Sequence, residues 1–149
     1  MFVTLIQATP DPINTIAAIA SICYDSDPKN PLGLVKHLYR NGHHSVFEHI
    51  YFTFKIEGIS RACSHQLVRH RHCSFTQRSQ RYCSEDGFSA VLPRSIEELG
   101  GKWDYGLVLN HIAEFYELSQ KVGVPNEDAR YVLPNACETA LFLLSLIHI

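Results

Sequence analysis

The residues of this sequence best suited to chemistry lie in one short basic segment, residues 69–82. Its fourteen positions hold four arginines and two histidines, interleaved with hydroxyl and amide side chains and without one acidic residue. Arginine presents a rigid fork of N–H donors that matches phosphate oxygens, and guanidinium groups so close together repel one another unless an anion lies among them. The segment therefore predicts a binding site for a phosphorylated ligand more than a solvated basic face.

This positive charge is local. Residues 58–84 contain five of the eight arginines and no Asp or Glu, whereas the chain of 149 residues has a net charge of −2. A general nucleic-acid binder usually has a basic balance over its whole domain, so no nucleic-acid partner is expected. One alternative stays open at this stage, a non-catalytic phosphate- or RNA-binding module built on the arginine-rich segment.

Four blocks of the chain resemble the flavin-dependent thymidylate synthases. They are HHSVFEH at 43–49, EGISRACSHQLVRHR at 57–71, Arg-His-Arg at 69–71 followed after seven residues by Ser79, and EDARYVLP at 127–134. The blocks keep the family's order and cover most of residues 1 to about 139. A lone Arg-His-Arg would carry no such weight. The length of the chain predicts one domain, here residues 1–149.

The resemblance implies a reaction and a fold. The reaction is the reductive methylation of dUMP to dTMP, with 5,10-methylenetetrahydrofolate as carbon donor and NADPH-reduced FAD as the source of electrons. The fold is α+β, a small mostly antiparallel sheet flanked by helices, in a homotetramer with shared active sites. No G-x-G-x-x-G follows the first predicted strand, so a Rossmann-type flavin site is not expected.

The family's ligand residues carry over position by position. The implied dUMP site consists of Gln66, Leu67, Val68, Arg69, Gln77, Arg78, Ser79, Gln80, Arg81 and Arg130. The implied FAD site consists of Ser45, Arg69, His70, Arg71 and Gln77. Many family members have Glu where Gln77 stands. For Arg81 and Arg130 the alternative is a surface ion pair with Glu127 or Asp128.

The sequence departs from the family after Thr139. The family continues into an Asn-x-Arg element that touches the flavin and an arginine that activates the uracil ring, whereas this sequence continues into the apolar run at 140–149. The resemblance therefore implies a C-terminally truncated chain without a catalytic residue of its own. We expect such a chain to be inactive, although dUMP or FAD could still bind.

Two other chemistries use the cysteines and histidines. A zinc site could draw on His43, His44, His49, Cys63, His65, His70, His72 and Cys73. These residues lack the tight ligand pairs of most zinc sites and have arginine neighbours that repel a cation, so no metal is predicted. A cysteine nucleophile at Cys73 or Cys83 would need a pKa lowered by arginines. The resembled family needs none, and we interpret Cys73 as a packing residue.

Composition gives the broad class. With 46% hydrophobic and 19% charged residues, the chain is typical of a globular protein. It has no membrane-length apolar run, and residues 1–6 lack the basic start of a signal peptide. Five cysteines without close pairs indicate reduced, mostly buried thiols in a cytoplasmic protein with no membrane partner.

Periodicity and local signals predict the elements that must position the basic segment. Asp11 followed by Pro12 predicts a capped helix start, with Cys23 on its buried face. A helix over 59–69 would place Arg61, His65 and Arg69 on one face. Residues 74–82 are expected to form an extended ligand loop, and 87–101 the loosest linker. Further strands are predicted at 2–7, 49–57 and 137–146, and further helices at 31–41, 102–122 and 126–130. The helix at 102–122 is expected to end at Gly123, Asn126 is expected to cap the next helix, and the apolar residues of the long helix are Trp103, Leu107, Ile112, Phe115 and Leu118.

Overall fold

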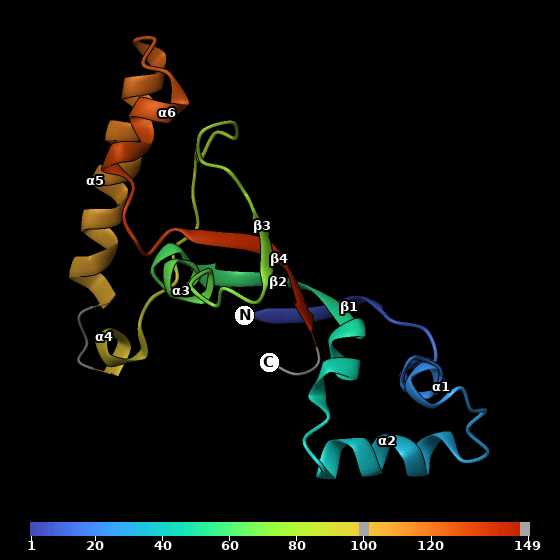
Figure 1. Cartoon of the computed structure of the whole chain (residues 1–149). Helices are drawn as coiled ribbons and strands as arrows, with labels where there is room; N and C mark the ends of the chain where they lie inside the picture. The colour runs from blue at the N-terminus through green and yellow to red at the C-terminus, as the bar shows by residue number, and fades with distance from the viewer. Residues whose placement is uncertain (99–101, 147–149) are drawn as a thin grey trace. The chain divides into compact units, whose positions relative to one another are not determined.

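The computed structural model describes residues 1–98 and 102–146, apart from the side chains of Tyr24, Lys102 and Trp103. Trp103, predicted on the apolar face of a long helix, therefore lies outside the described side chains. The described elements, drawn in Figure 1, are β1 (Phe2–Ala8), α1 (Pro12–Ser21), α2 (Pro31–Arg40), β2 (Tyr51–Ser60), α3 (Arg61–Leu67), β3 (Ser74–Gln77), α4 (Arg94–Glu98), α5 (Lys102–Lys121), α6 (Asn126–Ala129) and β4 (Glu138–Leu146). Short 3-10 helices cover Ile22–Tyr24, His44–His49 and Arg130–Val132.

The strands form one antiparallel sheet in the order β1-β2-β4-β3. The C-terminal strand β4 lies inside the sheet, between β2 and β3, and so brings residues 138–146 beside the basic segment. The structure combines this antiparallel sheet with helices, so the expected α+β class is confirmed. No helix among the described residues is both long and apolar enough to cross a membrane.

The chain divides into two compact units. The first contains Met1–Phe2, Ile56–His70 and Thr76–Leu141, and the second contains Val3–Lys55, Arg71–Phe75 and the chain from Phe142 onward. All four strands pass from one unit into the other.

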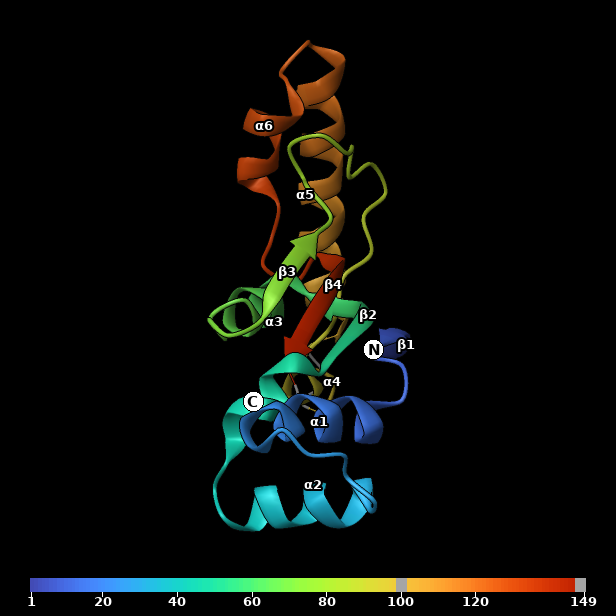
Figure 2. The same ribbon diagram turned by 45° about the vertical axis from the view of Figure 1, so that its right-hand side comes forward.

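In the second unit, α1 and α2 lie side by side (Figure 2). They pack together over a small apolar core. Its buried members are Ile16, Ala20, Val35, Leu38, Phe47 and Ile50. The capping prediction for Asp11 was wrong. Its backbone is left-handed at φ 44°, and its carboxylate accepts a bond from the Asn14 amide at 2.7 Å instead of capping the backbone. Helix α1 also ends at Ser21, so Cys23 lies beyond it and is exposed.

In the first unit, α3 is shorter than predicted. Strand β2 continues to Ser60, whose hydroxyl accepts a bond from the Cys63 N–H at 3.1 Å and so caps the helix. The helix ends at Leu67, and Arg69 lies in the following turn, where its N–H donates to the Gln66 carbonyl at 3.1 Å. Arg61 and His65 remain one turn apart on α3, but Arg69 is not on the helix.

The loop predicted over 74–82 was also partly wrong. Residues Ser74–Gln77 form β3, and the Arg78 N–H donates to the Ala140 carbonyl of β4 at 3.0 Å. The partner strand supplies backbone hydrogen bonds that compensate for the polar side chains of this segment. Only the residues after Gln77 leave the sheet, so the strand fixes where the loop begins.

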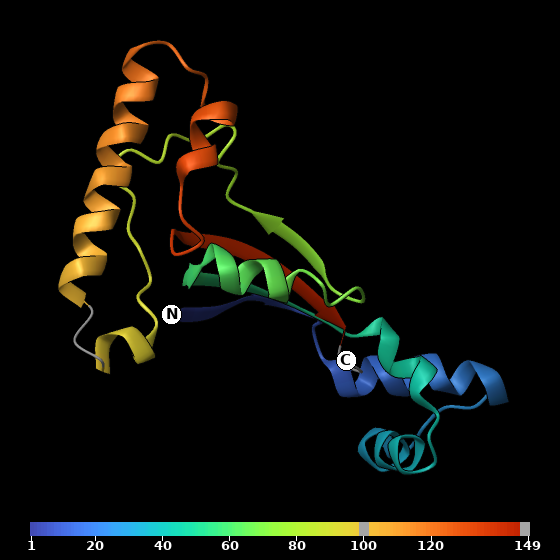
Figure 3. The same ribbon diagram turned by 90° about the vertical axis from the view of Figure 1, so that its left-hand side faces the viewer.

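Helices α5 and α6 lie side by side in the first unit (Figure 3). Helix α5 stops near Gly123, at φ 91°, as predicted, and buries Tyr116 completely. Leu107, Phe115 and Leu118 are instead 44%, 58% and 58% exposed. Helix α6 exists as predicted, but Asn126 is its first residue and not its cap, and it accepts a bond from Gln120 at 2.6 Å. Part of the predicted linker at 87–101 forms α4.

Candidate functional site

A cationic pocket opens in the first unit between α3 and the segment after α6. Its volume is about 290 Å³, and its lining contains Arg61, His65, Gln80, Arg130, Tyr131, Leu133, Pro134 and Asn135. Two guanidinium groups, an imidazole and two side-chain amides in one lining suit an anion with several oxygens. The structure thus brings the sequence-predicted Gln80 and Arg130 together with the cationic face of α3.

The loop that carries the motif residues is folded on itself. The Ser79 hydroxyl accepts a bond from the Arg81 N–H at 3.2 Å, and the Ser79 carbonyl accepts one from the Cys83 N–H at 3.0 Å. The Arg81 guanidinium pairs with Glu127 at 2.5 Å and lies 5.5 Å from the centre of the Tyr82 ring. The ion pair considered for Arg81 is therefore present, and it ties the loop to α6.

Arg130 is also held by α6. Its Nε donates to the Glu127 carbonyl at 3.0 Å, and its side chain lines the cationic pocket. Because Glu127 contacts Arg81 through its side chain and Arg130 through its main chain, this one residue lies beside both predicted phosphate ligands.

Gln77 links β3 to α3 and β4. Its side-chain Nε2 donates to the Ser64 hydroxyl at 2.7 Å and to the Thr139 hydroxyl at 3.3 Å. Ser64 is fully buried and donates its own proton to the Arg61 carbonyl at 3.0 Å. These hydrogen bonds therefore all run in one direction: the Gln77 amide donates to Ser64, and Ser64 donates to the backbone carbonyl of Arg61.

A buried carboxylate that the sequence did not single out lies behind the loop. Glu85 is 4% exposed, and its Oε2 lies 3.6 Å from Nη2 of Arg78. Burial raises the pKa of Glu85, while Arg78 and Arg61 act to lower it. Burial likewise lowers the pKa of Arg61, against the influence of Glu85. The only sequence signal for Glu85 is that it ends the acid-free run at 58–84.

The remaining predicted dUMP residues Gln66, Leu67 and Val68 lie on α3 and at its end, Gln66 and Val68 being exposed. Of the predicted FAD residues, Arg69 and His70 follow directly and are exposed. Ser45 and Arg71 belong to the second unit, Ser45 within the 3-10 helix His44–His49.

The sequence matches known proteins over most of its length. A family model described as "Thymidylate synthase complementing protein" matches residues 4–144. A flavin-dependent thymidylate synthase of Geobacter sulfurreducens is 41% identical over 165 residues, which cover 99% of this chain and 71% of that protein. One from Pyrococcus furiosus is 40% identical over 158 residues, covering 95% of this chain and 64% of that protein. The chain belongs to the flavin-dependent thymidylate synthase family.

Solved structures share this family's fold. A UMP/dUMP methylase, PolB from Streptomyces cacaoi bound with 5-Br dUMP, matches with a TM-score of 0.80 and 23% identity, over 97% of this chain and 72% of that one. Thymidylate synthase X from Helicobacter pylori with FAD and dUMP matches with a TM-score of 0.75 and 20% identity, over 99% and 79%. At these identities the likeness shows the fold alone.

The cysteines are free, but the prediction that most are buried was wrong. Cys23, Cys63 and Cys83 are exposed, Cys73 is half-buried and Cys137 is buried. Burial, with the nearby Glu85 carboxylate, raises the pKa of the Cys137 thiol to about 11. Within residues 1–98 and 102–146, no group of three His, Cys, Asp or Glu side chains is arranged to hold a metal ion.

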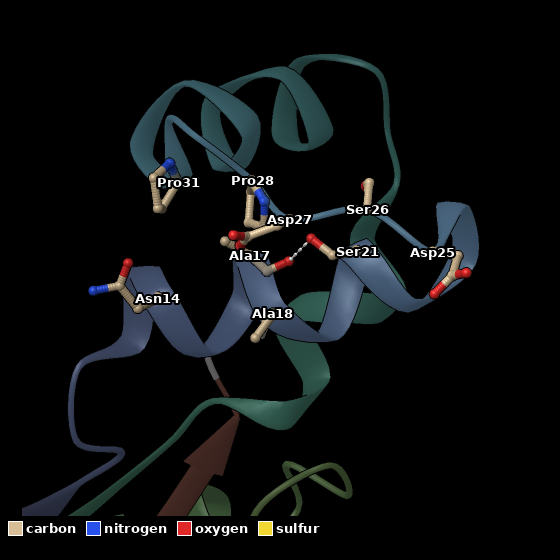
Figure 4. Close-up of a pocket in the computed structure, with 9 residues that line it drawn as sticks. All are labelled: Asn14, Ala17, Ala18, Ser21, Asp25, Ser26, Asp27, Pro28 and Pro31. Atoms are coloured by element: carbon tan, nitrogen blue, oxygen red, sulfur yellow. Dashed lines mark hydrogen bonds between the residues drawn. The ribbon is translucent and has the colours of Figure 1, made fainter.

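A separate cavity of about 680 Å³ lies in the second unit, against α1 and the segment that leads into α2 (Figure 4). Its lining is Asn14, Ala17, Ala18, Ser21, Asp25, Ser26, Asp27, Pro28 and Pro31. None of the predicted ligand residues lines it. The predicted dUMP residues all lie in the first unit, which also contains the cationic pocket.

Proposed function

We propose that this chain binds dUMP for reductive methylation to dTMP, with 5,10-methylenetetrahydrofolate as carbon donor and NADPH-reduced FAD as the source of electrons. The observation that carries this proposal is the cationic pocket with Arg61, Gln80 and Arg130, next to a loop that carries Ser79 and Arg81. The relatives that show the family are named flavin-dependent thymidylate synthases, and a solved structure with the same fold holds FAD and dUMP. The chain spans 71% and 64% of the two relatives named above.

In this proposal the phosphate of dUMP is bound by Ser79, Arg81 and Arg130. Arginine forks and a hydroxyl are strong donors for a dianionic phosphate. The Arg81–Glu127 pair is about half exposed, so its carboxylate can be exchanged for phosphate at little electrostatic cost. Gln66 serves the uracil ring as both donor and acceptor, whereas Gln77, whose amide nitrogen donates to Ser64 and Thr139, offers the ring its side-chain oxygen as an acceptor. Leu67, Val68, Arg78 and Gln80 complete the predicted set, with Arg69 where nucleotide and flavin meet.

FAD would be held by Ser45, Arg69, His70, Arg71 and Gln77. The donor set fits a diphosphate, because Arg69 and His70 are exposed cationic or potentially cationic groups just after α3. When bound, FAD supplies the electrons that reduce the transferred one-carbon unit. The residues of this chain bind and orient the two anionic ligands against each other.

A homotetramer is part of the same proposal. Helix α5 presents Val108, Phe115 and Leu118 at exposures of 56%, 58% and 58%, and Val122, in the turn directly after the helix, is 72% exposed. The three helical residues are spaced by seven and three positions, which puts them on one helical face, and apolar faces of this kind are buried in assemblies. Free cysteines and the reaction class fit a reducing compartment, the cytoplasm.

The test is titration calorimetry of the purified protein with dUMP and with deoxyuridine, together with flavin absorbance after incubation with FAD and gel filtration. We expect retained flavin and dUMP binding that depends on the phosphate. A folded protein that binds a ribo-oligonucleotide but neither dUMP nor FAD would favour the RNA-binding alternative and refute this proposal.

A further inference from the structure

We propose that Glu85 is a positioning residue of the nucleotide site: its buried carboxylate holds the Arg78 guanidinium and so fixes residues 78–85, the nucleotide loop. The loop carries Ser79 and Arg81, the residues assigned above to the phosphate. This inference rests on the proposed function, because it assigns a role within the same dUMP site.

Arg78 connects the two ends of the nucleotide loop. Its main-chain N–H donates to Ala140 at 3.0 Å, which ties the start of the loop to β4. Its Nη2 donates to the Ser84 carbonyl at 3.2 Å and lies 3.6 Å from the Glu85 carboxylate, which ties the same residue to the end of the loop. The Arg61 guanidinium donates to the Arg78 carbonyl at 3.2 Å. Arg78 thus links the start of the nucleotide loop to its end.

Glu85 is anchored independently of its side chain. Its main-chain N–H donates to the Tyr116 hydroxyl at 3.1 Å, and its carbonyl accepts from Phe88 at 3.0 Å. Tyr116 is fully buried on α5, and its hydroxyl also accepts from Gln120 at 3.2 Å. Because the backbone of Glu85 stays fixed without the carboxylate, removal of its charge is expected to loosen Arg78 more than the fold.

The charge balance argues for a role in the site. A carboxylate next to a phosphate site weakens anion binding by repulsion, and a buried one is costly unless it is paired. Glu85 is buried among Arg78, Arg61 and the Cys137 thiol, beside a cavity of about 290 Å³ that Glu57, Asp86 and Glu138 also line. Its arginine neighbours compensate for the burial. The carboxylate holds the Arg78 guanidinium at the end of the nucleotide loop. Arg78 would then contact dUMP through its main chain only.

The experiment compares Glu85→Gln and Arg78→Met with wild type by calorimetry, using dUMP and deoxyuridine as probes. We expect each variant to bind dUMP about tenfold more weakly, with deoxyuridine affinity changed less than about twofold, because the loop carries the phosphate ligands. The double variant should bind dUMP no more weakly than either single variant, since both substitutions remove the same Arg78–Glu85 contact. Glu98→Gln, which removes an exposed paired carboxylate on α4, is the matched control and should change neither affinity.

A pH series separates positioning from a general structural role. The Glu85 pKa is raised by burial, so protonation at falling pH should release Arg78 at a higher pH than an ordinary Glu would. As pH falls through the Glu85 pKa, the dUMP affinity of wild type should fall towards that of Glu85→Gln. Titration of the phosphate of dUMP affects both proteins equally, so it does not contribute to the difference between them. Circular dichroism confirms that each variant is folded, and Arg78→Met provides the same test should Glu85→Gln not fold.

The outcomes separate the two ideas. Wild type that binds no dUMP would overturn the proposed function and this inference with it. If wild type binds dUMP but both variants bind it equally well, or lose dUMP and deoxyuridine to the same extent, only the positioning role is refuted.

Discussion

Replacement of Gln77 by Glu tests the direction of the hydrogen bonds that link β3 to α3 and β4. The Gln77 amide donates to Ser64 at 2.7 Å and to Thr139 at 3.3 Å, and the single Ser64 proton is already donated to Arg61. A glutamate carboxylate only accepts. Ser64 could donate to this carboxylate only if it stopped donating to the Arg61 carbonyl. The Thr139 hydroxyl would also have to reorient so that it donates to the carboxylate.

The cost follows from burial. Ser64 is fully buried, and Thr139 is 5% exposed, so water replaces a lost partner poorly. One broken hydrogen bond with a buried group left unsatisfied costs about 1–3 kcal/mol. For a chain of this size, each kcal/mol lowers the melting temperature by roughly 2–4 °C, so we expect Gln77→Glu to melt several degrees below wild type.

Calorimetric melting across a pH series is the assay, with Gln66→Glu, the same change on the exposed face of α3, as control. The carboxylate at position 77 has lost its donors, so its folded pKa should rise above the unfolded value. The destabilisation is then full above the folded pKa and disappears as pH falls below the unfolded pKa, because a protonated Glu can donate again. Equal melting temperatures for Gln77→Glu and wild type at neutral pH would refute the assigned direction of these bonds.

Three further outcomes are expected. Arg69→Ala should weaken both dUMP and FAD binding about a hundredfold, measured by calorimetry and flavin retention, since a charge-assisted contact to each ligand is lost; unchanged binding of both would refute its placement. Ser79→Ala and Arg81→Ala should weaken dUMP at least about tenfold while sparing deoxyuridine, and equal losses would indicate a folding defect instead. Alkylation followed by mass spectrometry at pH 8 should label the exposed Cys83 quickly and leave Cys137 unmodified in the folded protein, because Cys137 is buried with a pKa of about 11; similar rates at both would contradict the buried environment.

The elements that the sequence predicted well depend on local signals. Pro12 marks the start of α1, and Gly42 and Gly123, at φ 73° and 91°, mark the ends of α2 and α5. The apolar run near the C-terminus became β4. The cap at Ser60 also has a local sequence signal, because serine is a preferred N-cap residue. The sequence around Gly58, however, did not reveal that β2 continues to Ser60.

The basic segment shows where local signals end. Three of the residues 74–77 carry polar side chains, and the segment was predicted as a loop. It forms β3 because β4, more than sixty residues later, supplies the backbone partners. The Gln77–Thr139 contact has the same origin, with a separation of 62 residues. Propensity alone does not contain this information, since sheet pairing depends on which strand the fold brings alongside.

The candidate site divides in the same way. The motif identified Gln80 and Arg130, and the helical spacing identified Arg61 and His65, so four lining residues of the cationic pocket were recognisable. Glu85 was not, because its sequence neighbours Ser84, Asp86 and Gly87 are typical of an exposed turn. Its burial is decided by Tyr116, 31 residues further on, which fixes its main chain, and by Arg78, which compensates its charge. A ligand motif specifies the groups that touch a substrate. The groups that hold such a loop in place are specified by the fold around it, and their role becomes visible only when burial and charge are known together.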